Sequence, residues 1–260
     1  AQHVKFTKCF CTRARVELMG EFRLHALAIN EVRDVFGADD VLAAKLRGWA
    51  LEAFPTPAQP DRHGGRNHLF RRTRRRSHIV MHRAGSPTER TADDLLEGRF
   101  VAPNELVKSW RVLDLWLEKL SWGTLTTSCT RREYDALEFE LARAGVPSYL
   151  GLNRLFGGDP QIPLRPAPGM RVGYSRACHV EATCAALNRA VPYLSDDNAR
   201  NVRTLVDFLE KFPTWYDEAR AAGRPRPDLI ILRHEDPTTL ATVPPVSTPG
   251  SGILPTRSAS

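Results

Sequence analysis

The chain has 260 residues, 42% hydrophobic and 26% charged, which is typical of one large globular domain or two ordinary ones. No apolar run approaches the roughly 18 residues that a membrane-spanning helix needs, which excludes a helical membrane protein. Five cysteines are too few, and odd in number, for a disulfide scaffold, so we expect a reducing compartment.

The net charge of +7 is concentrated in one window of the sequence. Residues 61–90 hold nine Arg against Asp61 and Glu89, whereas the remainder of the chain has 28 cations and 28 anions. Four of the eight His lie in the same window. A nearly neutral protein with one strongly basic segment is typical of a docking surface for a polyanion.

Hydrophobic periodicity predicts alternating strands and helices over the first hundred residues. Gly37 is placed as a helix stop and Pro55 as a strand end. The predicted elements are a strand over 14–22, a helix over 24–36, a further helical turn over 39–45, a strand over 46–54, a loop over 61–67, a strand over 74–83 and a helix over 91–98. This order is that of a split βαβ plan, in which two helices cover one face of a small sheet.

From residue 104 the pattern becomes mainly helical. Asn104 is placed as a helix cap, Thr130 and Glu133 have the spacing of a capping box, and Gly145 and Gly223 are placed as helix ends. The predicted elements are helices over 104–123, 130–144, 175–191, 195–211 and 215–222, a strand over 125–129, a Gly- and Pro-rich connection over 145–171, and a buried strand or apolar docking segment over 229–232. The Pro-, Thr- and Ser-rich residues 237–260 have little to bury, so we expect an extended tail there.

The basic segment has the chemistry of an RNA-binding arm. Guanidinium groups bind phosphate in pairs of hydrogen bonds and stack on bases. On an extended hairpin they would lie on both faces and follow an RNA backbone, reading its shape and 2′-hydroxyls. A solvated loop or a nuclear localisation signal is the alternative interpretation. The predicted RNA-binding residues are Arg62, Arg66, His68, Arg71, Arg72, Arg74, Arg75, Arg76, His78 and Arg83.

Other reactive side chains form weaker patterns. Cys9 and Cys11 make a Cys-x-Cys pair to which Cys178, His179 and Cys184 would add ligands, but zinc sites more often use paired Cys-x₂-Cys knuckles. Buried free thiols are therefore expected. The chain also contains no Gly-x-Ser-x-Gly elbow, His-Glu-x-x-His motif or phosphate-binding loop. We expect no metal, no cofactor and no catalytic residues.

Taken in order, the motifs of the first third resemble the universal small-subunit ribosomal protein ten family. Residues 15–18 are similar to its first strand, residues 24–35 to its first helix, and Pro55-Thr56 to the end of its second strand. The Arg-Ser-His sequence at 76–78 matches an element of that family, and Pro-Thr-Glu-Arg-Thr-Ala-Asp at 87–93 matches its turn into a second helix. The resemblance covers about residues 14–100.

The chain departs from that family in its loop and its length. The loop before residue 76 is shorter and richer in Arg, the family's last strand is not evident over 99–103, and about 160 residues follow. Such extensions are typical of mitochondrial forms, and a start at Ala1 fits removal of a presequence. The resemblance implies a structural constituent of the small subunit of the mitochondrial ribosome, in the matrix, bound to ribosomal RNA and neighbouring small-subunit proteins. It implies no catalysis, cofactor, membrane or small-molecule substrate.

The expected fold class is α+β, with an N-terminal ferredoxin-like split βαβ sheet, a long basic hairpin loop and a mainly helical extension. The expected divisions are an arm over 1–13, a ribosomal-protein-like RNA-binding domain over 14–103, the extension over 104–236 and the tail over 237–260. One alternative is an RNA-processing or RNA-modifying enzyme that uses the Arg-rich loop as a substrate clamp, with a site around His179, Glu181 and Asp207. Another is an interaction module outside the ribosome.

Overall fold

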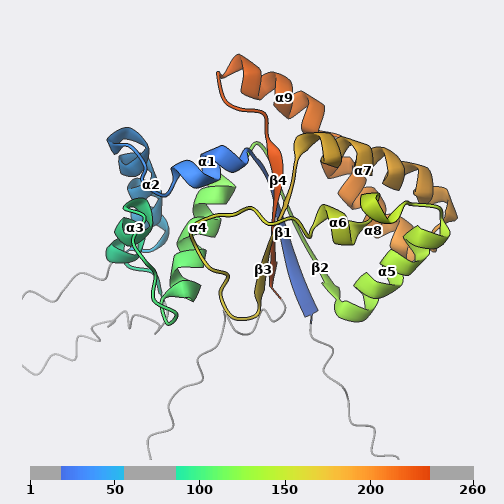
Figure 1. Cartoon of the computed structure of the whole chain (residues 1–260), viewed down its shortest axis with the longest axis horizontal. Helices are drawn as coiled ribbons and strands as arrows, with labels where there is room; N and C mark the ends of the chain where they lie inside the picture. Colours follow the sequence, from blue (N-terminus) through green and yellow to red (C-terminus); the bar gives the residue numbers. More distant parts are fainter. Residues whose placement is uncertain (1–18, 56–85, 235–260) are drawn as a thin grey trace, which may run out of the picture.

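The computed structural model describes residues 19–55 and 86–234. They form an α+β architecture in which a four-stranded antiparallel sheet stands between two groups of helices (Figure 1). The coarse fold class expected from the sequence is therefore confirmed. The sheet has the order β2-β1-β4-β3, formed by β1 (Met19–Leu27), β2 (Thr124–Thr130), β3 (Met170–Ser175) and β4 (Asp228–His234).

The two helical groups pack on opposite faces of the sheet and build two separate hydrophobic cores. One core is formed with α1 (Ile29–Asp34), α2 (Asp40–Ala53), α3 (Glu89–Leu96) and α4 (Leu106–Leu120). The other is formed with α5 (Arg131–Arg143), α6 (Leu152–Leu155), α7 (Ala177–Ala190), α8 (Asp196–Leu209) and α9 (Phe212–Ala221), together with the short 3₁₀ turns η1 (Ser148–Leu150) and η2 (Val191–Tyr193). Within the described residues, no helix is both long and apolar enough to cross a membrane.

Alternation along the central strands assigns each side chain to one core. Phe22, Leu24 and Ala26 of β1 enter the core of α5 to α9, whereas Leu27 enters the core of α1 to α4. The same alternation places Leu229 and Ile231 of β4 in the core of α5 to α9, and residues 230 and 232 in the core of α1 to α4. Because successive side chains of a strand point to opposite faces, β4 is apolar on both sides over 229–232, whereas β1 is apolar on one side and carries Glu21, Arg23 and His25 on the other.

The helix predicted over 24–36 is wrong in its first half. Residues 24–27 belong to β1, and a helix begins only at Ile29 and ends at Asp34. Residues 24–28 are all buried, His25 included, because β1 is a central strand covered on both sides, and a short run of this kind fits a helix as well as a strand. Gly37 ends the helical stretch as predicted, with a φ of +92°.

The strand predicted over 46–54 is also wrong, because these residues lie in α2. Asp39 caps this helix by accepting a hydrogen bond from the Leu42 N–H, and the helix then continues for 14 residues. Its buried positions are Ala43, Leu46 and Ala50, which have the spacing of one helix face. The predicted strand over 74–83 lies outside the described residues.

Most elements after residue 104 are confirmed. Thr130 and Glu133 form the predicted capping box at the start of α5, and Gly145 and Gly223 follow helices with positive φ values of +85° and +65°. The predicted Asn104 cap is wrong, since Glu105 is the first flanking residue and no side chain caps α4. Strand β3 was not predicted.

The sheet unites parts of the chain that the sequence analysis had divided at residue 103. Strand β1 comes from the interval 14–103, and its partners β2 and β4 come from 104–236. The described residues of 14–103 contribute this one strand, and it has no parallel neighbour. The described residues thus form a single shared antiparallel sheet, and a separate split βαβ unit is not confirmed among them.

One carboxylate links the two helical groups at the start of β4. Asp228 accepts hydrogen bonds from the Ile29 N–H at 3.2 Å and from the Ala177 N–H at 3.0 Å, which are the first residues of α1 and α7. The Tyr174 hydroxyl also donates to it at 3.3 Å. A single side chain therefore satisfies amide groups at two helix N-termini on opposite sides of the sheet.

Candidate functional site

The ten predicted RNA-binding residues all fall within 56–85 and lie outside the described residues, as do Cys9 and Cys11. The structure does describe the two points between which this segment is inserted. It begins after Phe54 and Pro55 at the end of α2, and the chain returns at Ser86, two residues before Thr88 caps α3. The Arg-rich segment is therefore an insertion between two successive helices.

Helices α2 and α3 pack against each other and give this insertion a fixed base (Figure 1). Arg47 on α2 donates a hydrogen bond to Asp93 on α3 at 2.7 Å, and Ala50 and Ala92 are buried in the same core. The Arg47 side chain is 39% exposed, so the ion pair is screened and contributes modestly to stability. The buried apolar residues of both helices, Leu46 and Leu95 among them, lie in the same core and stabilise this base.

A cavity of about 290 Å³ opens beside Phe54, at the base of the insertion. Strands β1, β3 and β4 supply part of its wall, and α4 and Phe54 at the end of α2 supply the rest. Its apolar lining residues are Phe54, Trp110, Leu115 and Met170, and its polar lining residues are Arg23, Arg111, Asp114, Glu118 and His234. We refer to it as the charged pocket.

A connected group of charged side chains forms the floor of the charged pocket. The Arg23 guanidinium donates to Glu21 at 2.5 Å and also to Asp114 on α4. On the far side of Asp114 lies His25, whose Nε2 is 3.4 Å from the carboxylate and which is only 2% exposed. Asp114 thus lies between a guanidinium and a buried imidazole.

The environment shifts the pKa of two groups in this pocket. Burial acts to raise the pKa of Asp114, but the contact with His25 and the charge of Arg23 outweigh it and hold the pKa below its ordinary value. Burial lowers the pKa of His234, and the nearby Asp114 opposes this only in part. At neutral pH, Asp114 is therefore ionised and His234 is neutral.

The sequence builds this pocket through two periodicities. Glu21, Arg23 and His25 alternate with apolar residues along β1, so all three lie on the face that α4 covers. On α4, Asp114 follows Trp110 by four residues and therefore borders the buried face of that helix. The alternation of these three polar residues indicates a polar strand face, but the helix predicted over 24–36 interrupts that pattern before its last member.

The pocket offers hydrogen-bond donors and acceptors side by side. Within the described part of the chain, Arg23 Nη2 has no partner, and the exposed Glu118 has none either. Two cationic and two anionic side chains line the space, so its formal charge is zero while His234 is neutral. Among residues 19–55 and 86–234, no three His, Cys, Asp or Glu residues are grouped closely enough to hold a metal ion.

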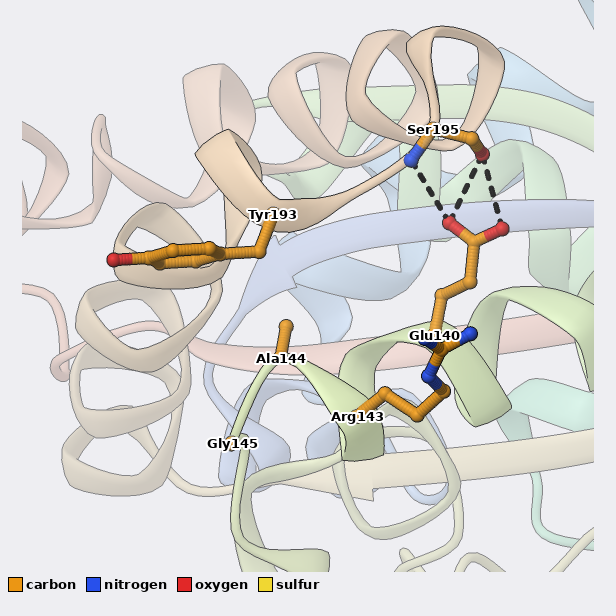
Figure 2. Close-up of a pocket in the computed structure, with 6 residues that line it drawn as sticks. All are labelled: Glu140, Arg143, Ala144, Gly145, Tyr193 and Ser195. Carbon is orange, nitrogen blue, oxygen red and sulfur yellow. Dashed lines mark hydrogen bonds between the residues drawn. The ribbon is translucent and has the colours of Figure 1, made fainter.

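A second cavity, of about 490 Å³, lies between the end of α5 and the start of α8 (Figure 2). Its central contact is the Glu140 carboxylate, which accepts from the Ser195 N–H at 3.0 Å and from its hydroxyl at 2.9 Å. Figure 2 shows Tyr193 pointing away from this carboxylate. Hydrogen bonds from the Ser195 backbone and from Asn198 lower the pKa of Glu140. This geometry is a helix cap supplied by a neighbouring helix, which accounts for the polar groups present.

The residues named for an enzyme in the helical extension lie on α7 and α8. Glu181 is paired with Arg226 at 2.6 Å, and Asp207 is exposed on α8. Burial lowers the pKa of His179, whose ring nitrogen is 3.5 Å from the Thr183 hydroxyl. Burial also raises the pKa of the Cys184 thiol to about 11, which keeps it protonated and unreactive at neutral pH.

Comparison with known proteins identifies a family. Residues 19–234 match a family described as a domain of unknown function, DUF7691. The chain belongs to this family. The DUF7691 match begins with the first residue of β1 and ends with the last residue of β4, so it spans the whole sheet and includes the Arg-rich insertion. No curated protein and no solved structure matches the chain significantly.

Proposed function

We propose that the protein binds RNA through residues 61–83 and acts as a non-catalytic structural constituent of a ribonucleoprotein. The observation that supports this most strongly is a separation of charge between two parts of the chain. The described residues hold 24 Lys and Arg against 26 Asp and Glu, whereas residues 56–85 hold eight Arg against the single Asp61. A polyanion is attracted to the inserted segment and not to the folded body.

Ion pairs on and beside α2 and α3, the helices that flank the insertion, strengthen this argument. Arg47 is bonded to Asp93, and Arg99 is bonded to both Asp94 and Glu97. These arginines are neutralised by acids of the body. The arginines of the insertion face a single acid within their own segment, and the two packed helices at its base hold both of its ends.

The narrower form of the proposal places the protein in the small subunit of a mitochondrial ribosome, where the Arg-rich segment forms a hairpin in ribosomal RNA. Residues 104–234 would then contact neighbouring small-subunit proteins. This placement is supported by the motifs at 76–78 and 87–93 and by the Thr88 cap that starts α3 within the second motif. It draws no support from residues 24–54, whose elements differ from those of the ribosomal protein family.

The test of RNA binding is its salt dependence. The slope of log K against log salt is negative, and each phosphate contact adds about 0.9 to its magnitude. We expect the triple variant Arg74→Ala, Arg75→Ala, Arg76→Ala to reduce that magnitude by about two to three units. Fluorescence anisotropy of a labelled structured RNA measures this slope on the full chain. An unchanged slope would contradict the proposal.

A matched control removes three arginines from the body. Arg131, Arg200 and Arg220 are exposed and form ion pairs with acids on their own helices. Replacing these three by Ala changes the net charge by the same amount, and the slope is expected to stay constant. Sedimentation through sucrose at high salt then tests the ribosomal placement, since only a subunit constituent comigrates with the small subunit.

The charged pocket favours one second candidate, an RNA-processing or RNA-modifying enzyme that uses the insertion as a substrate clamp. Asp114 and His234, whose pKa values both lie below their ordinary values, line a cavity beside the insertion. Prolonged incubation with RNA, followed by mass spectrometry of the RNA, distinguishes the two candidates. If the wild-type protein alters the mass of the RNA and the Asp114→Asn variant does not, the enzyme is favoured.

A further inference from the structure

The charged pocket lies beside the end of α2, from which the insertion continues. Phe54, which forms one of its walls, is two residues before the segment 56–85 begins. The pocket is not suited to a phosphate group, because the carboxylates of Asp114 and Glu118 offset the positive charges of Arg23 and Arg111, which line it as well. Since burial keeps His234 neutral at neutral pH, it adds no positive charge.

A nucleobase fits this lining better than a phosphate, because a base presents donors and acceptors next to each other without a formal charge. We propose that the charged pocket receives one unstacked base of the bound RNA, and that it prefers guanine. This inference rests on the RNA-binding function proposed above. Single-stranded bases are commonly recognised in this way, by stacking on an aromatic ring and by hydrogen bonds to their edges.

The preference for guanine rests on two side chains of the lining, Glu118 and Arg23, which have polar atoms without a hydrogen-bond partner among the described residues. Guanine has N–H donors along one edge and the acceptors O6 and N7 along another. The Glu118 carboxylate accepts from the N–H groups, and Arg23 Nη2 donates to O6 or N7. Adenine places an acceptor where guanine has an N–H, so a carboxylate repels it at that position.

The size and walls of the pocket are consistent with a single base. Its volume of about 290 Å³ lies at the lower end of the range for small-molecule sites, which is roughly 300–1,000 Å³. Phe54 is half-buried and offers an aromatic face, while Leu115 and Met170 provide apolar contact. Base stacking on an aromatic side chain is a common source of affinity for single strands.

The floor of the pocket is held in place before any ligand arrives. Arg23 is bonded to Glu21 and Asp114, and Asp114 also contacts the buried His25. The orientation of the remaining N–H group of Arg23 is therefore set by protein contacts. Preorganisation of this kind lowers the entropy cost of binding, and it makes Asp114 a positioning residue for Arg23.

The experiment is a calorimetric titration of the full chain with guanosine, adenosine, cytidine and uridine 5′-monophosphates. These probes carry the same phosphate charge, so a difference in affinity reports on the base. We expect guanosine monophosphate to bind at least fivefold more tightly than adenosine monophosphate. Glu118→Gln should remove this preference, while the control Glu210→Gln, at the exposed residue that follows α8 on the other side of the sheet, should retain it.

A second variant separates stacking from edge recognition. Phe54→Ala should weaken all four nucleotides by a similar factor, about fivefold or more, and keep their order. Equal affinities for the four nucleotides, or an unchanged preference in Glu118→Gln, would overturn the inference. If the pocket experiment fails but the salt slope of RNA binding still depends on Arg74–Arg76, only the guanine inference is overturned. If guanosine monophosphate is preferred but the salt slope does not depend on these arginines, the RNA-binding function is overturned and the base-binding pocket is retained.

Discussion

The two faces of β1 differ sharply although they belong to one strand. On one face, Phe22 packs against Tyr134 and Phe156, with ring centroids 5.8 and 5.6 Å apart. On the other face, Arg23 and His25 hold the Asp114 carboxylate of α4. When a buried group of charged residues of this kind is replaced by well-packed apolar residues, the protein is often as stable as before or more stable. The comparison teaches that the apolar face carries the stability of the sheet, while the polar face keeps groups suited to binding.

The largest expected effect is on the apolar face. Phe22→Ala should lower the free energy of unfolding by about 3–5 kcal/mol, because it removes a buried ring and leaves a cavity between β1 and α5. Urea denaturation measures this loss. Phe139→Ala is the control, since that ring is 65% exposed on α5 and its removal should change stability by less than about 0.5 kcal/mol. Similar losses in both variants would contradict the assignment of stability to this face.

Asp228 tests the connection between the two sides of the sheet. Asp228→Ala should cost about 2–3 kcal/mol, because it leaves the Ile29 and Ala177 amides without their acceptor and each lost cap costs about 0.5–2 kcal/mol. Asp228→Asn keeps a carbonyl oxygen and should lose less. Thermal and urea unfolding give both values. An equal loss in the two variants would show that charge, and not capping, is the property that matters.

The polar face is expected to respond less. Asp114→Asn should cost about 1–3 kcal/mol, below the usual penalty for breaking a buried pair, because Arg23 is 38% exposed and can rehydrate. The same urea experiment measures it. Asp217→Asn, which breaks an exposed pair with Arg220 on α9, is the matched control and should cost less than about 0.5 kcal/mol. A loss for Asp114→Asn larger than for Phe22→Ala would reverse the comparison between the faces.

The smallest effect is the pH dependence of this same carboxylate. Because the pKa of Asp114 is lowered in the folded state, its stabilisation is complete above the unfolded value of about 3.9. It is lost as the pH falls through the lower folded value. The difference in unfolding free energy between wild type and Asp114→Asn should therefore be constant from pH 7 to about 5 and shrink below about 4. If the difference in unfolding free energy between the two proteins grew below about pH 4, the pKa of Asp114 would be raised on folding, which would contradict its pairing with Arg23 and His25.

Local sequence signals predicted the second half of the fold well. The Thr130 and Glu133 capping box, Gly145 and Gly223 mark helix ends through contacts within a few residues, so the sequence contains the whole signal. The prediction of a strand over 46–54 is wrong because the apolar residues there fit the period of a strand as well as that of a helix. Its helix is decided by distant packing, in which Trp116 of α4 donates to the Leu46 carbonyl at 2.9 Å.

The charged pocket was not predictable for a related reason. Arg23 and Asp114 are 91 residues apart, and only the pairing of α4 with the sheet brings them together. His234 joins them because β4 lies beside β1, with Glu21 opposite His234 in the register. By contrast, the Arg-rich segment was visible from composition alone, and its role in binding stays a prediction because it lies outside the described residues.

The placement of the first and last strands at the centre of the sheet has a consequence for biosynthesis. Strand β1 is made early, but its partner β4 begins at Asp228, some two hundred residues later. The middle of the sheet therefore closes only after β4 has been synthesised, and contacts of such long sequence separation slow folding. Until then the β1 edge stays unpaired on the β4 side, which exposes it to chaperones and to premature association with other nascent chains.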